Sequence, residues 1–186
     1  MSVLRTEFFV SLDRFLDGLV HPDVARDAVA HARHRAFIAA HLTTGALALA
    51  ITPVYWALAG RSGLLEVALL VTLAAMAPLA LIVARTGRLE LGHILASLAM
   101  TGLIAFVAAM TGGLSSLALI WLILVPIEAS LSGRRSVVLA AVAIAVAGVG
   151  AVAAAASLQW TLPVSGAVPE GFVAVIATIA LSYAGL

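Results

Sequence analysis

Three ionisable side chains, His41, His93 and Glu128, stand with a fourth, Glu66, inside long apolar stretches of the sequence, where each is a candidate functional group. Glu66 lies near the start of its stretch and close to Arg61, where an ordinary ion pair is the favoured interpretation. The other three form a separate group. Charge in a hydrocarbon environment is costly, so such residues usually pair with one another or face a polar cavity. Counting about 1.5 Å of rise per residue from the ends of the stretches puts all three at a similar depth. The sequence therefore allows one cluster of two imidazoles and a carboxylate, without showing whether they face one another.

Three interpretations of such a cluster are open. In the first it is structural, and its carboxylate is held by arginines that reach in from the membrane surface. The candidate arginines are Arg88, Arg134 and Arg135. In the second it binds a ligand or senses protons, because histidine is the side chain whose charge changes near neutral pH. In the third, His41 and His93 bind a metal or a haem iron, although no further pattern supports ligation.

A second group of candidate ligands precedes the first apolar stretch. His31 and His34 are three residues apart and share a helix face, and Asp27 lies one turn before them. Two imidazoles and a carboxylate could bind zinc, but a structural zinc site needs a fourth ligand and none is evident. We prefer a solvated polar face and expect no cofactor. The chain has no cysteine and no Walker, zincin or nucleophile-elbow motif, so we expect no catalysis within it.

Six apolar stretches position these groups. A stretch of about 18 or more apolar residues crosses the roughly 30 Å hydrocarbon core as a helix. Because 63% of the 186 residues are apolar and 10% are charged, a soluble protein is excluded. The sequence predicts an all-α integral membrane protein, a bundle of six transmembrane helices in residues 36–186. The predicted spans are 36–59, 64–84, 91–110, 117–131, 137–157 and 172–186.

Two of these spans are unusual in length or ending. Span 117–131 is short for a membrane crossing. Span 172–186 is still apolar where the chain stops, which predicts that the chain is part of a longer protein.

The arginines indicate the orientation of the spans. All ten cationic residues are arginine, and nine of them fall in the segments 1–35, 85–90 and 132–136. Only Arg61 falls in the other linkers, and arginine is enriched in cytoplasmic loops. Both ends are therefore predicted to be cytoplasmic, an N-in, C-in topology. Tryptophans, which favour membrane interfaces, fall at the opposite ends of the spans. They are Trp56, Trp121 and Trp160.

Residues 1–35 are predicted to be cytoplasmic helices. Leu4, Phe8, Leu12, Phe15 and Leu19 recur at helical spacing, which indicates an amphipathic helix over residues 3–20. Its polar face mixes both charges, so packing under the bundle is at least as favoured as binding to anionic lipid. A second helix is predicted to begin at Pro22 and to continue into the first span.

Prolines and small residues suggest how the spans bend and pack. Pro53, Pro78 and Pro126 lie within predicted spans and are expected to kink them. A kink at Pro126 would expose backbone acceptors beside Glu128. In span 137–157, small residues recur every fourth position, and we favour packing inside the bundle over a dimer interface. This repeat consists of Ala143, Ala147, Ala151 and Ala155.

The stretch from Met110 to Arg135, MTGGLSSLALIWLILVPIEASLSGRR, resembles the membrane portion of DivJ-type alphaproteobacterial sensor histidine kinases. In that family a Gly-Gly hairpin is followed by a helix with tryptophan and by a Pro-x-Glu-Ala-x-Leu-Ser-Gly motif with arginine. The six-span plan is similar too. The residues that match the motif are Pro126, Glu128, Gly133, Arg134 and Arg135. The resemblance assigns no role to them.

The resemblance implies a membrane sensory and anchoring domain of a bacterial two-component sensor histidine kinase in the inner membrane. It would pass a signal through span 172–186 to a cytoplasmic kinase domain that is absent from this chain. The expected partners are the lipid bilayer, a second copy of the chain and that kinase domain, and no nucleic acid. One alternative is a stand-alone small membrane binder or transporter that uses the region of Pro126 and Glu128. Another is the membrane domain of a nucleotide cyclase.

Overall fold

The computed structural model describes residues 2–24, 26–59 and 63–158, and within these ranges every element is a helix. The α-helices are α1 (Ser2–Leu19), α2 (Ala28–Ala59), α3 (Leu64–Ala74), α4 (Met76–Thr86), α5 (Leu89–Thr111), α6 (Leu124–Ser130) and α7 (Arg135–Ser157). Two 3-10 helices, η1 (Gly113–Ser115) and η2 (Leu117–Ile123), lie between α5 and α6. The predicted all-α class is thus confirmed for the described residues.

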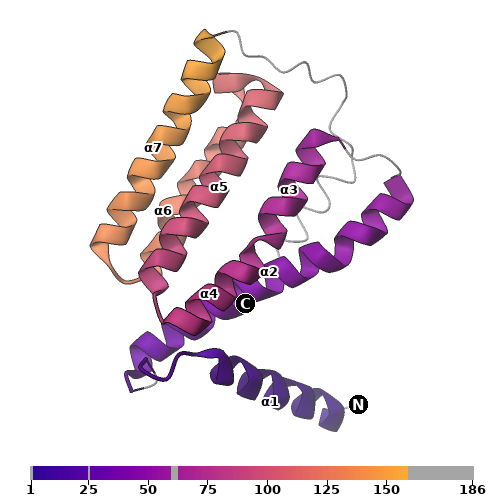
Figure 1. Cartoon of the computed structure of the whole chain (residues 1–186), viewed down its shortest axis with the longest axis vertical. Coiled ribbons are helices and arrows are strands. Elements are labelled where there is room, and N and C mark those ends of the chain that lie inside the picture. Colours follow the sequence, from indigo (N-terminus) through magenta and orange to yellow (C-terminus); the bar gives the residue numbers. More distant parts are fainter. Residues whose placement is uncertain (1, 25, 60–62, 159–186) are drawn as a thin grey trace.

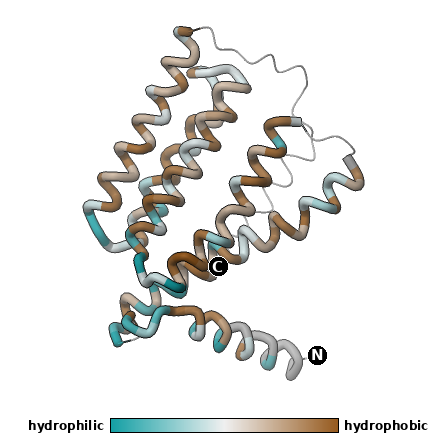
Figure 2. Tube along the Cα trace, viewed as in Figure 1, coloured by the Kyte–Doolittle hydropathy of each residue, from teal (hydrophilic) through white to brown (hydrophobic). Residues whose placement is uncertain are grey.

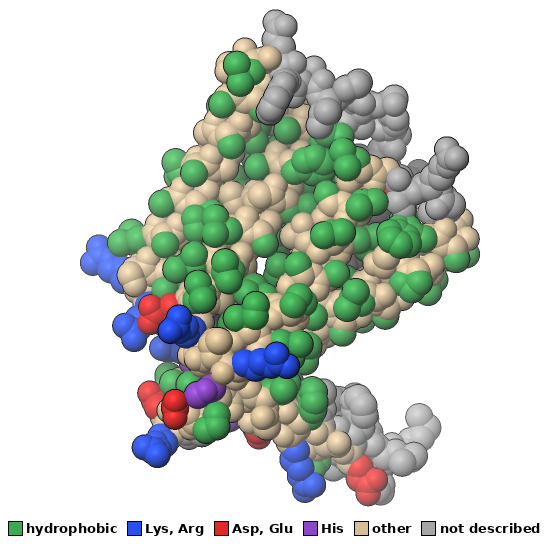
Figure 3. Space-filling view, in the orientation of Figure 1, with side chains coloured by type: hydrophobic (Ala, Val, Ile, Leu, Met, Phe, Trp, Pro, Cys, Tyr) green, Lys and Arg blue, Asp and Glu red, His purple; other side chains and the backbone are tan. Residues whose placement is uncertain are grey.

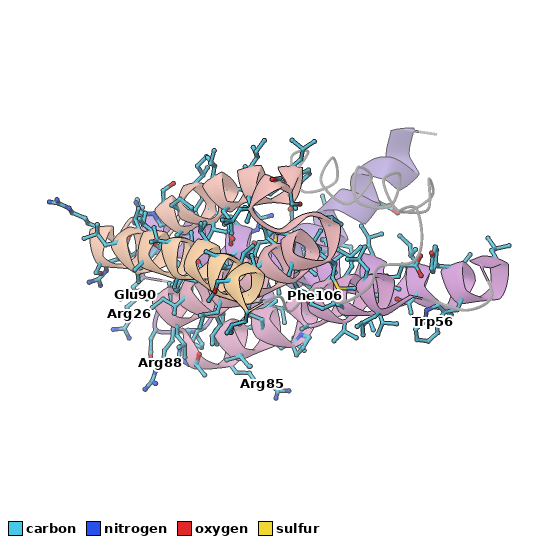
Figure 4. The ribbon with its side chains drawn as sticks, turned by 90° about the horizontal axis from the view of Figure 1, so that it is seen from above. Arg26, Trp56, Arg85, Arg88, Glu90 and Phe106 are labelled. Carbon is cyan, nitrogen blue, oxygen red and sulfur yellow. The ribbon has the colours of Figure 1, made fainter. Side chains whose placement is uncertain are left out.

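The helices form two groups, which are joined where α5 contacts α3 and α4. Figure 1 shows α2, α3 and α4 in one group, α5, α6 and α7 in the other, and α1 across the end of the bundle. Apolar residues dominate the helices of both groups, and hydrophilic residues gather at the end where α2 begins (Figure 2). In Figure 4, Arg26, Arg88 and Glu90 lie toward one end of the molecule and Trp56 lies at the other.

Four helical stretches are long and apolar enough to cross a membrane, which indicates a multi-pass membrane protein. They are Ala28–Leu58, Leu64–Thr86, Leu89–Thr111 and Arg135–Ser157, and they contain the first, second, third and fifth predicted spans almost entirely. The fourth, 117–131, is a shorter apolar helix, Leu117–Ser130. The sixth predicted span, 172–186, lies outside the described residues.

Two of the helices that follow a break have a proline as their third residue. Pro78 is the third residue of α4, which follows α3 after a break at Ala75. Pro126 is the third residue of α6, which follows directly on η2. Proline has no N–H to donate to the preceding turn, so it fits the first turn of a helix better than its interior. Two of the three predicted kink sites are therefore helix starts, whereas the third, Pro53, lies inside an uninterrupted α2.

Glycines let helices within each group approach closely. A Cβ at Gly45 of α2 would overlap the backbone nitrogen of Ala77 in α4. A Cβ at Gly148 of α7 would overlap the side-chain methyl of Thr101 in α5. Small residues at such contacts allow the van der Waals packing that associates helices in lipid.

The small-residue repeat of span 137–157 does not pack against the other described helices, contrary to the prediction of packing inside the bundle. Ala143, Ala147 and Ala151 are exposed. The buried face of α7 instead consists of Val137, Ala141, Ala145, Gly148 and Val152. Both faces carry small residues, so residue size alone does not select the buried one. The Thr101 side chain, which packs against Gly148, marks the face that α5 contacts.

The start of the first membrane helix also differs from the prediction. Residues 22–24 form a turn rather than a helix, and α2 begins at Ala28. The Asp27 carboxylate accepts hydrogen bonds from the amides of Val29 (2.9 Å) and Ala30 (3.4 Å). A capping carboxylate satisfies these first-turn donors, which explains the position of the helix start. From there α2 continues to Ala59, so the predicted continuation into the first span is confirmed.

Helix α1 is attached to α2 through its polar face. Arg35 of α2 forms ion pairs with Asp13 and, at 3.2 Å, with Asp17. Phe15 of α1 is 56% exposed. Packing under the bundle, one of the two predicted arrangements of this helix, is therefore what the described residues show.

Candidate functional site

Three of the four ionisable residues predicted inside the spans meet at one point, and we call them the His–Glu–His cluster. His41 comes from α2, His93 from α5 and Glu128 from α6. Glu128 Oε1 lies 3.3 Å from His41 Nε2 and 3.6 Å from His93 Nδ1. His41 and His93 are 4% and 3% exposed, and the Glu128 side chain is 15% exposed. One buried carboxylate thus joins three helices through two imidazoles.

His41 faces the backbone of its own helix with one ring nitrogen and Glu128 with the other. His41 Nδ1 lies 3.0 Å from the carbonyl oxygen of Phe37, one turn earlier in α2, and donates a hydrogen bond to it. The other ring nitrogen, Nε2, faces Glu128 Oε1. A neutral imidazole with its hydrogen on Nδ1 would place a bare Nε2 against a bare carboxylate oxygen. Either an imidazolium donates to the carboxylate, or a carboxylic acid donates to the imidazole.

Phe37 forms one wall of the cluster. Its ring stacks on His41 at a centroid distance of 3.9 Å and meets His93 edge-on at 4.7 Å. Phe37 itself is buried. One aromatic ring thus contacts both imidazoles of the cluster.

Two buried hydroxyl groups continue from the cluster along α5. Ser97 and Thr101 follow His93 at intervals of four residues, and they are 0% and 5% exposed. Neither hydroxyl has a hydrogen-bond partner in the described part of the chain. Other threonine hydroxyls of the spans do donate to the carbonyl four residues earlier, which is usual in membrane helices. These are Thr52, Thr72, Thr86 and Thr111. A stripe of available polar groups therefore leads from His93 into the bundle.

Ser97 and Thr101 are not recognisable as site residues from the sequence alone. The only signal for them is their spacing, because residues four apart lie on one face of a helix. That spacing identifies a shared face but does not show that the face is buried.

The arginines considered as partners of Glu128 lie elsewhere. Arg134 Nε pairs with Glu90 Oε1 at 3.0 Å. Arg88 and Arg135 are exposed, and neither forms an ion pair within the described ranges. Glu128 is therefore contacted by the two histidines rather than by an arginine. Pro126 lies two residues before it, in the first turn of α6.

The other histidine pair does not converge on one point. His34 is buried, and its Nδ1 and Nε2 face the carbonyl oxygens of Ala30 (2.8 Å) and Gly87 (3.0 Å). His31 Nε2 instead lies 4.0 Å from Asp17 Oδ1. Among the described residues, no group of three or more His, Cys, Asp or Glu side chains is placed to hold a metal ion.

The arrangement defines a helical membrane protein whose distinguishing site is a buried histidine–carboxylate cluster. No family model matches the chain, and no curated protein or solved structure matches it either. Function must therefore be inferred from the residues and their geometry.

Proposed function

We propose that this chain is the membrane sensory and anchoring domain of a bacterial two-component sensor histidine kinase. The observation that supports this proposal most is the His–Glu–His cluster, which links three helices through ionisable groups. A sensor needs an element with two arrangements whose balance a signal can shift. The kinase output is suggested by the resemblance of residues 110–135 to DivJ-type proteins, a stretch that includes Glu128.

The signal would act by changing the charge or the contacts of the cluster. In a medium of low dielectric constant, gain or loss of one proton strongly alters the attraction between charged groups. Because the three partners stand on α2, α5 and α6, this attraction determines how α6 is held against the other two helices. We propose that the bundle lies in the inner membrane with both ends cytoplasmic. The rearrangement would then reach a cytoplasmic kinase domain through residues 172–186.

The test uses the protein encoded by the native gene, in membrane vesicles supplied with labelled ATP. We expect phosphorylation on histidine, with a rate that differs on the two sides of neutral pH. The substitution Glu128→Gln keeps the size of the side chain but removes its charge, and it should abolish this dependence on pH. Glu90→Gln removes one charge outside the cluster and should leave the dependence intact. Absence of histidine phosphorylation, or an unchanged pH profile in Glu128→Gln, would contradict the proposal.

A stand-alone binder or transporter of a small polar molecule is the second candidate. The observation that favours it is the pair of buried hydroxyls of Ser97 and Thr101, which extend the polar groups beyond the cluster. Such a protein would take up or bind a solute without any kinase domain. In vesicles that contain only the purified chain, Glu128→Gln would then abolish uptake, and the native gene would encode no kinase sequence.

A further inference from the structure

A cavity of about 550 Å³ lies at the arginine-rich end of the bundle, apart from the His–Glu–His cluster. Three segments that are distant in sequence line it: the start of α2, the turn between α4 and α5, and the turn between α6 and α7. Its polar lining includes Arg33, His34, Arg88, Glu90, Ser132 and Arg134. Figure 3 shows cationic and anionic side chains at this end of the bundle and along α1, whereas the visible side chains of the other described helices are mainly apolar.

Each of the three segments contributes one guanidinium group. Arg33 comes from α2, Arg88 from the turn before α5, and Arg134 from the turn before α7. Arg134 is paired with Glu90. Arg33 and Arg88 form no ion pair with any described residue. The cavity therefore holds two cations that are not neutralised by the described part of the protein.

The carboxylates of the lining do not offset these cations. Asp27 already accepts the first amides of its own helix α2, and Glu90 is paired with Arg134. His34 is buried in this lining, and its two ring nitrogens face the carbonyl oxygens of Ala30 and Gly87 rather than either arginine.

The turn at Gly133 is shaped around Arg33. Gly133 has φ of +70°, a left-handed conformation that glycine adopts without strain. A Cβ at this position would overlap the guanidinium of Arg33. The backbone of the α6–α7 turn thus lies directly against Arg33 and holds it beside the cavity.

We infer that this cavity binds a phosphate-bearing anionic group, carried either by the headgroup of an anionic phospholipid or by a soluble phosphate compound. Guanidinium groups bind phosphate oxygens through paired charge-assisted hydrogen bonds. Basic pockets between membrane helices are suited to anionic headgroups when they lie at the cytoplasmic surface. The first residues of α5, Leu89, Glu90 and Leu91, also line this cavity, and the positive end of the helix dipole adds to the attraction.

The proposal can be tested with the whole chain purified in a neutral detergent. Its thermal unfolding is followed while dioctanoyl phosphatidylglycerol is added, because a ligand that binds the folded state raises the unfolding temperature. Dioctanoyl phosphatidylcholine, with the same chains and no net charge, should have little effect. In the double variant Arg33→Gln/Arg88→Gln, we expect the apparent affinity for phosphatidylglycerol to fall roughly ten- to thirtyfold.

The matched control is Arg85→Gln/Arg135→Gln, which removes two arginines that do not line the cavity. All four of these arginines are exposed, so neither double variant removes a buried side chain. The control should bind phosphatidylglycerol as the unchanged protein does. Equal losses in the two double variants would show attraction to general surface charge and would overturn the proposal.

Inorganic phosphate distinguishes the two sources of the ligand. If phosphate alone raises the unfolding temperature, and does so only while Arg33 and Arg88 are present, a soluble phosphate compound is the ligand. If phosphatidylglycerol raises the unfolding temperature in this arginine-dependent way and inorganic phosphate does not, the ligand is a lipid headgroup. If neither stabilises the unchanged protein more than Arg33→Gln/Arg88→Gln, the cavity is not an anion site.

Discussion

Replacing Glu128 with alanine is expected to lower the free energy of unfolding by about 3 kcal/mol, because it leaves two buried imidazoles without their shared carboxylate. His41 and His93 are almost fully buried, so water cannot replace the lost partner without opening the bundle. Removal of one member of a buried charged pair costs much more than the pair contributes, since the remaining charge is uncompensated. Unfolding of the purified protein in detergent, with sodium dodecyl sulfate as denaturant, measures the change.

Two further variants test whether the loss of stability comes from leaving the two imidazoles without their carboxylate. Glu90→Gln removes an exposed carboxylate and should change stability by less than about 0.5 kcal/mol. A triple variant with leucine at His41, His93 and Glu128 removes the whole cluster. It should be about as stable as the unchanged protein, because apolar side chains often replace a buried charged group without loss. If Glu128→Ala unfolds like the unchanged protein, the carboxylate does not hold the helices together.

The second large effect is expected at Gly45, where substitution by alanine should cost about 2–3 kcal/mol. The new Cβ would overlap the backbone nitrogen of Ala77, which cannot rotate away as a side chain could. Helices α2 and α4 would have to separate, and the van der Waals contacts along their interface would be lost. The same denaturant titration measures this loss.

Gly102→Ala is the matched control for Gly45→Ala. Gly102 also lies inside a membrane helix, α5, but a Cβ there would have no atom within 4 Å. Alanine favours the helical conformation more than glycine does, so this variant should be neutral or slightly stabilising. Equal losses at Gly45 and Gly102 would show that the helix conformation, rather than the contact with Ala77, is responsible.

The depth of residues in the membrane could be predicted from the sequence, but their direction around each helix could not. Depth follows from the nearly constant rise of a helix, which is why His41, His93 and Glu128 could be assigned to one layer. Direction depends on how each helix packs and where it breaks. The exposed Ala143 and the buried Ala145 differ only in this respect. Their side chains are identical, so no property of the residue separates them.

Partners that are distant in the chain were also beyond sequence reasoning. The zinc hypothesis treated His34 as free to join His31, yet His34 contacts the carbonyl of Gly87, 53 residues later. In the same way, Arg134 was considered for Glu128 but pairs with Glu90. Contacts of this kind depend on which helix ends meet, and one sequence contains no periodic pattern that reports it.

The 3-10 winding of η2 has a geometric consequence for α6. A 3-10 helix rises about 2.0 Å and turns about 120° per residue, whereas an α-helix rises about 1.5 Å and turns about 100°. Rewinding the seven residues of η2 as α-helix would draw α6 along its axis by about 3.5 Å and rotate it by about 140°. The two movements are coupled like those of a screw. Glu128 would leave His41 and His93 by this movement alone, with α2 and α5 unchanged in place.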